Sequence, residues 1–181
     1  MGEYNSRQLI KRRFYAMRNG LLADQLRRAG SPYKIIFGLN VPQLKEIAAE
    51  FSGDAELLAF LRADVRCRES RLIAPMLADA AALTAADAAS WLASVESVEE
   101  ADILSHSLLR RHPDAAAIAS SVLADVPAGP LGLRAYAALR LLGHLPSSSL
   151  TPETIGLVSA LREGADAATT MLCNNILDSL K

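Results

Sequence analysis

Asp102 is the residue whose type and position could do chemistry, because it interrupts the apolar pattern of an expected helix. The stretch from Ser97 to His112 carries apolar residues at helical spacing, namely Val98, Ala101, Leu104, Leu108 and Leu109. Asp102 lies in the row of Val98, beside the expected buried stripe rather than opposite it. A carboxylate there is either paired with a base or used in chemistry. Both interpretations, a structural ion pair and a catalytic acid, stay open at this point.

The ends of this helix are marked by its own residues. Ser97 followed by Glu100 predicts a capping box, and Pro113 ends the segment because the residue before a proline avoids the helical region. We expect Glu99 and Glu100 to be solvated. His106 follows Asp102 by one turn and could pair with it, as a structural contact or as an acid–base couple.

Other kinds of chemistry leave no trace in the sequence. It contains no HExxH, GxSxG or P-loop pattern, and Cys67 and Cys173 are too far apart in sequence for metal-ligand spacing. We therefore expect no cofactor and no metal. Two unpaired cysteines favour a reducing compartment, and no apolar run approaches membrane-spanning length. Cytoplasm is the expected location, with no membrane partner.

Charge is distributed unevenly along the chain. The net charge is −1, yet residues 1–34 carry eight Lys or Arg against Glu3 and Asp24. A basic N-terminal segment on a nearly neutral protein suggests an anionic partner, and a solvated helix face explains it equally well.

The secondary-structure elements that carry these residues are all predicted to be helices. The first three run from Asn5 to Arg18, from Leu21 to Ala29, and from the cap Asn40 to Phe51. Helix starts then recur near Asp54, Thr84, Asp114 and Thr151, each opening a pair: 54–64 with 66–79, 84–95 with 97–112, 114–126 with 130–145, and 151–163 with 165–181. Such repeats are typical of an all-α, HEAT-like α-solenoid of antiparallel helix pairs, here as one domain over residues 1–181. An irregular helical bundle is the alternative.

Arginines are concentrated in the second helix of each predicted pair. Seven arginines and no lysine occur between residues 63 and 161, at Arg66, Arg68, Arg71, Arg110, Arg111, Arg134 and Arg140. Because like-numbered helices of a solenoid stack on one face, we expect a surface lined with guanidinium groups. Guanidinium binds phosphate in a planar, bidentate manner.

The sequence resembles the AlkD-like DNA alkylation repair family of HEAT-like repeat DNA glycosylases, as a short divergent branch. The resemblance covers most of the chain and rests on four stretches: Gly38-Leu-Asn-Val-Pro-Gln-Leu-Lys-Glu-Ile-Ala, Arg68-Glu-Ser-Arg-Leu-Ile-Ala, the Asp102 helix, and Leu133-Arg-Ala-Tyr-Ala-Ala-Leu.

The resemblance implies a curved solenoid whose concave groove holds double-stranded DNA by its backbone. It also implies removal of positively charged alkylated purines without flipping them into a pocket. Matched residue by residue, the acid that stabilises the sugar cation is Asp102, and the phosphate-holding arginine is Arg134. The family's tryptophans do not match. Val98 occupies the position one turn before the acid, and Trp91 lies on the preceding helix, where packing is expected.

Three functions are compatible with these observations. The first is a DNA-binding repair protein of the alkylation-repair type, an N-glycosyl hydrolase at most weakly active on cationic alkylated purines, with Asp102 as catalytic acid. The second is a non-catalytic DNA-binding member of the family, and the third a helical-repeat scaffold for other proteins. For the first two we expect DNA contacts from the seven arginines, a groove lined by Val98 and His106, and a monomer.

Overall fold

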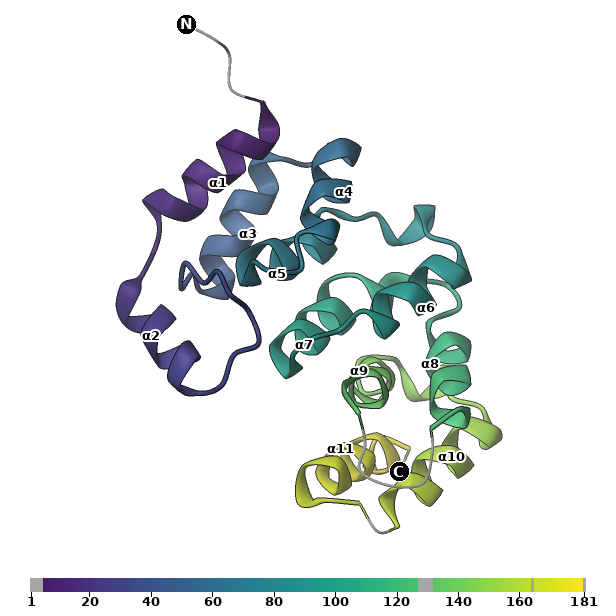
Figure 1. The fold of residues 1–181 in the computed structure, drawn as a ribbon. Helices are drawn as coiled ribbons and strands as arrows, with labels where there is room; N and C mark the ends of the chain where they lie inside the picture. The colour runs from purple at the N-terminus through teal and green to yellow at the C-terminus, as the bar shows by residue number, and fades with distance from the viewer. Residues whose placement is uncertain (1–4, 127–131, 164, 181) are drawn as a thin grey trace, which may run out of the picture. The chain divides into compact units, whose positions relative to one another are not determined.

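The computed structural model describes residues 5–126, 132–163 and 165–180, and these residues are helical apart from turns, loops and one parallel bridge between Ile35 and Cys67 (Figure 1). The α-helices are α1 (Ser6–Ala16), α2 (Gly20–Arg28), α3 (Val41–Glu50), α4 (Ala55–Ala63), α5 (Arg68–Leu77), α6 (Ala85–Ala93), α7 (Val98–Ser107), α8 (Ala115–Ala124), α9 (Leu133–Leu142), α10 (Pro152–Arg162) and α11 (Ala167–Asp178). Three short 3₁₀ turns complete the list: η1 (Ala80–Ala82), η2 (Leu109–Arg111) and η3 (Ser147–Ser149). The all-α prediction is confirmed.

Side-chain caps begin most of these helices where the sequence predicts. Asn5, Asn40 and Thr84 each form a capping box with the residue three positions later. Thr151 caps α10, and Pro152 follows it at the first helical position, where a missing N–H costs little. The start of the predicted helix 130–145 and the last residue of 165–181 lie outside the described residues.

Most helices are slightly shorter than predicted, and two differ more clearly. The helix predicted at 66–79 begins only at Arg68, and the one predicted at 97–112 ends at Ser107 and continues as the 3₁₀ turn η2. Ser97 does cap α7 by accepting a hydrogen bond from the Glu100 N–H. The prediction that Glu100 is solvated is wrong: its side chain is buried and accepts a hydrogen bond from the N–H of Glu96.

The chain forms two compact units, Met1–Ala78 and Asp79–Lys181. The single repeat domain over residues 1–181 stays a prediction. None of the helices in the described ranges is long and apolar enough to cross a membrane.

In the first unit, a buried carboxylate holds the loop that connects α2 and α3. Glu69 of α5 accepts hydrogen bonds from the backbone N–H groups of Phe37 (3.0 Å), Gly38 (2.9 Å) and Leu39 (3.3 Å). Arg68 donates to the same carboxylate and to the carbonyl of Leu39. Gly38 has φ +79°, and a Cβ added there would lie 2.2 Å from the carbonyl oxygen of Asn19. The loop is therefore fixed to the helical core.

In the second unit, the helix pairs stack as a repeat architecture predicts. The second helices of successive pairs are neighbours, α7 packing against α9 and α9 against α11. The first helices are neighbours as well, α6 packing against α8 and α8 against α10. Both α7 and α9 carry small and aliphatic side chains that are almost fully buried, including Ala101, Leu104, Ala137, Ala138 and Leu141. Small residues allow the two helix backbones to approach closely, which brings their outer side chains within reach of each other.

Candidate functional site

Asp102 lies within the second unit in direct contact with two side chains of α9. The Nε of Arg140 donates to Oδ1 of Asp102 over 2.6 Å, and the hydroxyl of Tyr136 lies 3.4 Å from the same oxygen. The Asp102 and Arg140 side chains are 39% and 30% exposed. The acid is therefore paired with a base, and the pair still has access to solvent.

The α7–α9 contact fixes this geometry. Ser105 lies three residues after Asp102, on the same face of α7, and its buried hydroxyl donates to the carbonyl of Ala137 on α9 over 3.1 Å. Tyr136 and Arg140 are four residues apart on α9 and so lie one above the other. This buried hydrogen bond helps to fix the position of α9 along α7. In that position Tyr136 and Arg140 lie beside Asp102.

Two histidines extend the cluster. The rings of His106 on α7 and His144, just after α9, lie edge to face with 5.3 Å between their centroids. Burial lowers the pKa of His144, and Arg140, His106 and Arg110 lower it further, while Asp102 acts in the opposite direction. His144 is therefore neutral at pH 7.

The pKa of Tyr136 is raised, first by burial and then by the negative charge of Asp102. The phenol therefore keeps its proton at neutral pH, and that proton is available to Asp102. The cluster combines one carboxylate, one permanent cation, one phenol and two imidazoles, which suits electrostatic and hydrogen-bonding roles toward a charged ligand.

Arg134 lies elsewhere on α9. It is exposed on the first turn of the helix, six residues before Arg140 and therefore about 120° away around the helix axis. It forms no ion pair with any residue in the described ranges. Its guanidinium group is available to an external anion.

The other arginines predicted to bind DNA fall into two groups. Arg66, Arg110 and Arg111 are exposed, and Arg111 donates to the carbonyl of Ser107. Arg68 and Arg71 are buried, with 3% and 4% of their surface exposed. Arg68 holds Leu39 and Glu69, as described above, and Arg71 donates to the carbonyl of Arg62 at the end of α4.

The burial of Arg68 and Arg71 corrects their predicted role. Both guanidinium groups bind partners inside the first unit, so they stabilise the fold in place of contacting phosphate. The surplus of arginines predicted for second helices therefore has two causes, an exposed set and a structural set, which the sequence does not separate. Three exposed arginines also lie outside those helices, because Arg66 precedes α5 and Arg110 and Arg111 lie in η2.

Val98 lies at the surface, whereas Trp91 is buried in the core. Val98 is 48% exposed and lies on α7 one turn before Asp102, so it borders the cluster and does not belong to the core. Trp91 of α6 is 3% exposed, which agrees with the packing role expected for it. An aliphatic side chain therefore flanks the acid.

Tyr136 and His144 are members of this cluster that sequence reasoning did not assign, and Arg140 was expected to contact DNA without being recognised as the partner of Asp102. The spacing of Tyr136 and Arg140 was a usable signal, because residues four apart share a helix face. What no single sequence reveals is which helix that face meets.

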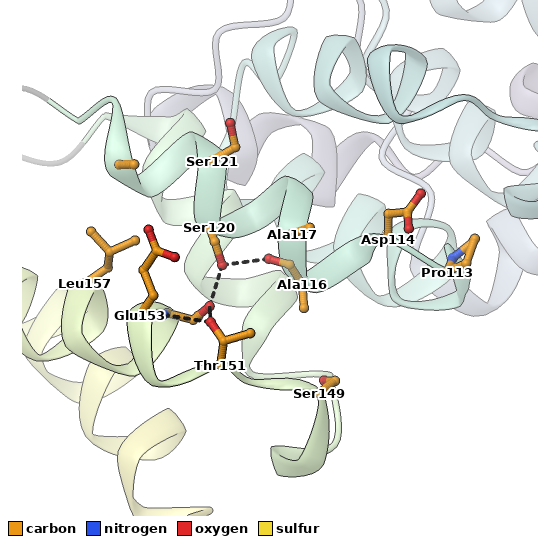
Figure 2. Close-up of a pocket in the computed structure, with 12 residues that line it drawn as sticks. Pro113, Asp114, Ala116, Ala117, Ser120, Ser121, Ser149, Thr151, Glu153 and Leu157 are labelled. Atoms are coloured by element: carbon orange, nitrogen blue, oxygen red, sulfur yellow. Dashed lines mark hydrogen bonds between the residues drawn. The ribbon is translucent and has the colours of Figure 1, made fainter.

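A separate pocket of about 480 Å³ lies between α8, η3 and α10 in the second unit (Figure 2). Its hydroxyl groups bind one another: Ser120 donates to the carbonyl of Ala116 and lies 2.7 Å from the Thr154 hydroxyl, which lies 2.9 Å from that of Thr151. Because these hydroxyls are partnered and no histidine, lysine or arginine lines the pocket, we assign it no chemistry.

Metal-binding geometry is absent from the parts of the chain that the structure describes. No three His, Cys, Asp or Glu side chains come together there in a way that could hold an ion.

The two units differ in formal charge. Residues 1–78 contain thirteen Lys or Arg and eight Asp or Glu, whereas residues 79–181 contain six and twelve. The first unit is thus basic and the second acidic, with the exposed arginines of the second unit embedded in a negative background.

The similarity of this chain to known proteins lies in its fold. No protein-family model matches the chain, and no curated protein sequence does. One solved structure is similar, with a TM-score of 0.76 and 17% identity over 97% of this chain and 76% of that one. It is described as a new family of proteins related to the HEAT-like repeat DNA glycosylases with affinity for branched DNA structures. The chain therefore has the HEAT-like repeat fold of that structure, as the sequence resemblance implied.

Proposed function

We propose that this protein is a DNA-binding protein of the repair type that holds duplex or branched DNA by its phosphates. We further propose that it releases cationic alkylated purines slowly or not at all. The observation that carries the proposal is the contact between Asp102 and Arg140, which joins the only acid matched to the family's catalytic position with a permanent cation.

DNA binding is supported by the exposed arginines of the second unit. Arg110 and Arg134 are exposed, and Arg140 is partly exposed beside Asp102. Guanidinium groups pair with phosphate oxygens and release condensed counterions when they do so. The basic first unit adds long-range attraction for a polyanion.

Slow catalysis follows from the ion pair, the solvent exposure and the aliphatic neighbour of Asp102. Departure of a cationic base leaves positive charge on the sugar, and a nearby carboxylate stabilises that charge most when the site is dry. Here the carboxylate already faces Arg140, is 39% exposed to water, and has Val98 in place of a flanking aromatic ring. Each of these conditions reduces the stabilisation that Asp102 offers to a sugar cation.

The test measures binding of the full-length protein to a labelled duplex and to a four-way junction of the same sequence, between 50 and 300 mM salt. We expect the logarithm of the affinity to fall linearly with the logarithm of salt concentration, with a slope of about 0.9 per neutralised phosphate. Arg134→Glu weakens binding to every sequence alike, because phosphate contacts carry no sequence information.

Arg162→Glu is the matched control, since it makes the same charge change on α10, on an exposed residue distant from Asp102 in the sequence. Equal losses from the two variants indicate net charge alone and contradict a defined interface. Absence of binding at 50 mM salt contradicts the proposal and favours a scaffold for other proteins.

A further inference from the structure

We propose that Tyr15 and Arg18, at the end of α1, form a platform on which an unpaired nucleotide stacks. The first unit then holds the single-stranded part of a branched or opened DNA. This inference rests on the proposed function for its ligand class, and it concerns a surface that Asp102 and its neighbours do not include.

The platform is already assembled in the free protein. The guanidinium carbon of Arg18 lies 3.9 Å from the centroid of the Tyr15 ring, and one of its nitrogens donates to the carbonyl of Tyr15 over 2.8 Å. This hydrogen bond helps to keep the guanidinium group over the ring. An aromatic ring with a guanidinium group beside it is a combination on which a nucleobase can stack.

The Tyr15 side chain does not belong to the hydrophobic core. It is 60% exposed, whereas the adjacent Phe14 is fully buried and supplies the aromatic packing of α1. Leu21, at the start of α2, is 72% exposed, so the next helix also presents a large apolar side chain to solvent. Exposed aromatic side chains beside cations are characteristic of surfaces that bind single-stranded nucleic acid.

The surrounding charge favours a polyanion as the occupant. Three cations of α1 and α2 are neutralised within the unit. They form the ion pairs Lys11–Asp64, Arg13–Glu50 and Arg27–Asp24. Arg18 and Arg28 are exposed on the surface of the same unit. Residues 1–34 as a whole carry eight basic and two acidic residues, which attracts phosphate and repels a basic protein partner.

An unpaired strand fits this platform better than a duplex does. Duplex bases are covered on both faces by their neighbours, so an exposed aromatic ring has no base face to contact within a duplex. A single strand exposes its base faces, and stacking on one aromatic side chain changes affinity by about five- to a hundredfold per base.

The experiment uses the full-length protein with a labelled twelve-nucleotide oligothymidine, the matching duplex, and a fork with one single-stranded arm. We expect Tyr15→Ala to weaken binding to the single strand and the fork about tenfold, with little effect on the duplex. Tyr15→Phe, which keeps the ring, stays within twofold of the natural protein. Arg18→Lys keeps the charge but not the plane and loses most of the single-strand affinity.

Met171→Ala is the matched control, because Met171 is also 60% exposed but lies on α11 of the other unit. Equal losses for single strand and duplex with Tyr15→Ala, or no loss for either, overturn the inference. So does Tyr15-dependent binding to anionic vesicles that exceeds binding to the oligonucleotide.

The inference and the proposed function fail in different ways. A Tyr15→Ala variant that binds all three DNAs normally while Arg134→Glu binds the duplex weakly refutes the platform and leaves the proposed function standing. Tyr15-dependent binding to the single strand without any duplex binding supports the platform and refutes the duplex interface.

Discussion

The Nε of Arg140 lies 2.6 Å from Oδ1 of Asp102, and the two residues come from the second helices of successive pairs. Because both side chains are about a third exposed, solvent screens the pair, and its contribution to folding is on the order of 0–1 kcal/mol. Its main consequence is electrostatic, since it sets the charge that an approaching phosphate or sugar cation meets.

Neutralising the acid should strengthen DNA binding. In Asp102→Asn, Arg140 keeps its charge while the repulsion between Asp102 and phosphate disappears, so we expect affinity for duplex DNA to rise severalfold at low salt. Arg140→Gln has the opposite effect. Fluorescence anisotropy with a labelled duplex measures both, and weaker binding by Asp102→Asn would show that the carboxylate contacts the DNA directly.

Base excision should be slow in the natural protein and faster in Val98→Trp. A tryptophan one turn before Asp102 would exclude water and pack against the sugar, and one well-placed charge in a dry site changes a barrier by about 2–4 kcal/mol. Asp102→Asn removes any activity that remains. The assay measures release of N7-methylguanine from alkylated duplex DNA, and robust release by the natural protein would show that Val98 suffices at this position.

The sequence predicted the helices well because their starts are encoded locally. Caps such as Asn40 and Thr84 act within three residues, and the 3.6-residue apolar period needs no distant information. The candidate site depended on contacts between segments far apart in the chain. Arg68 and Arg140 look alike in sequence, yet one is buried against Glu69 and the other meets Asp102, because helix packing decides which side of each helix faces solvent.

Replacing Glu69 should strongly destabilise the first unit, whereas replacing the exposed Arg66 should not. Glu69→Gln removes a buried charge and leaves Arg68 without its counterion, which costs about 3–5 kcal/mol. Gly38→Ala is similarly damaging because its Cβ would overlap the backbone of Asn19. Arg66→Ala, on an exposed side chain, is the control and changes stability by less than about 0.5 kcal/mol.

Chemical denaturation monitored by circular dichroism measures these differences in the free energy of unfolding. A Glu69→Gln protein as stable as the natural one would mean that the Phe37–Leu39 loop does not depend on the buried carboxylate.

Stability should fall as pH drops below about 6.5, in part because of His144. The pKa of His144 is lowered in the folded protein, first by burial and then by Arg140, His106 and Arg110, against the opposing effect of Asp102. Between this lowered pKa and the ordinary value, the unfolded chain therefore binds more protons at His144 than the folded chain does. The free energy of unfolding then rises with pH across that window and levels off above it.

Denaturation curves of the natural protein and of His144→Gln, recorded from pH 5 to pH 8, isolate this contribution. The other titrating groups remain in both proteins, so the difference between the two curves reports His144. We expect the natural protein to lose more stability than the variant between pH 7 and pH 5. Parallel curves would mean that His144 titrates alike in the folded and unfolded chains, and that the cations beside it are too well screened to oppose its protonation.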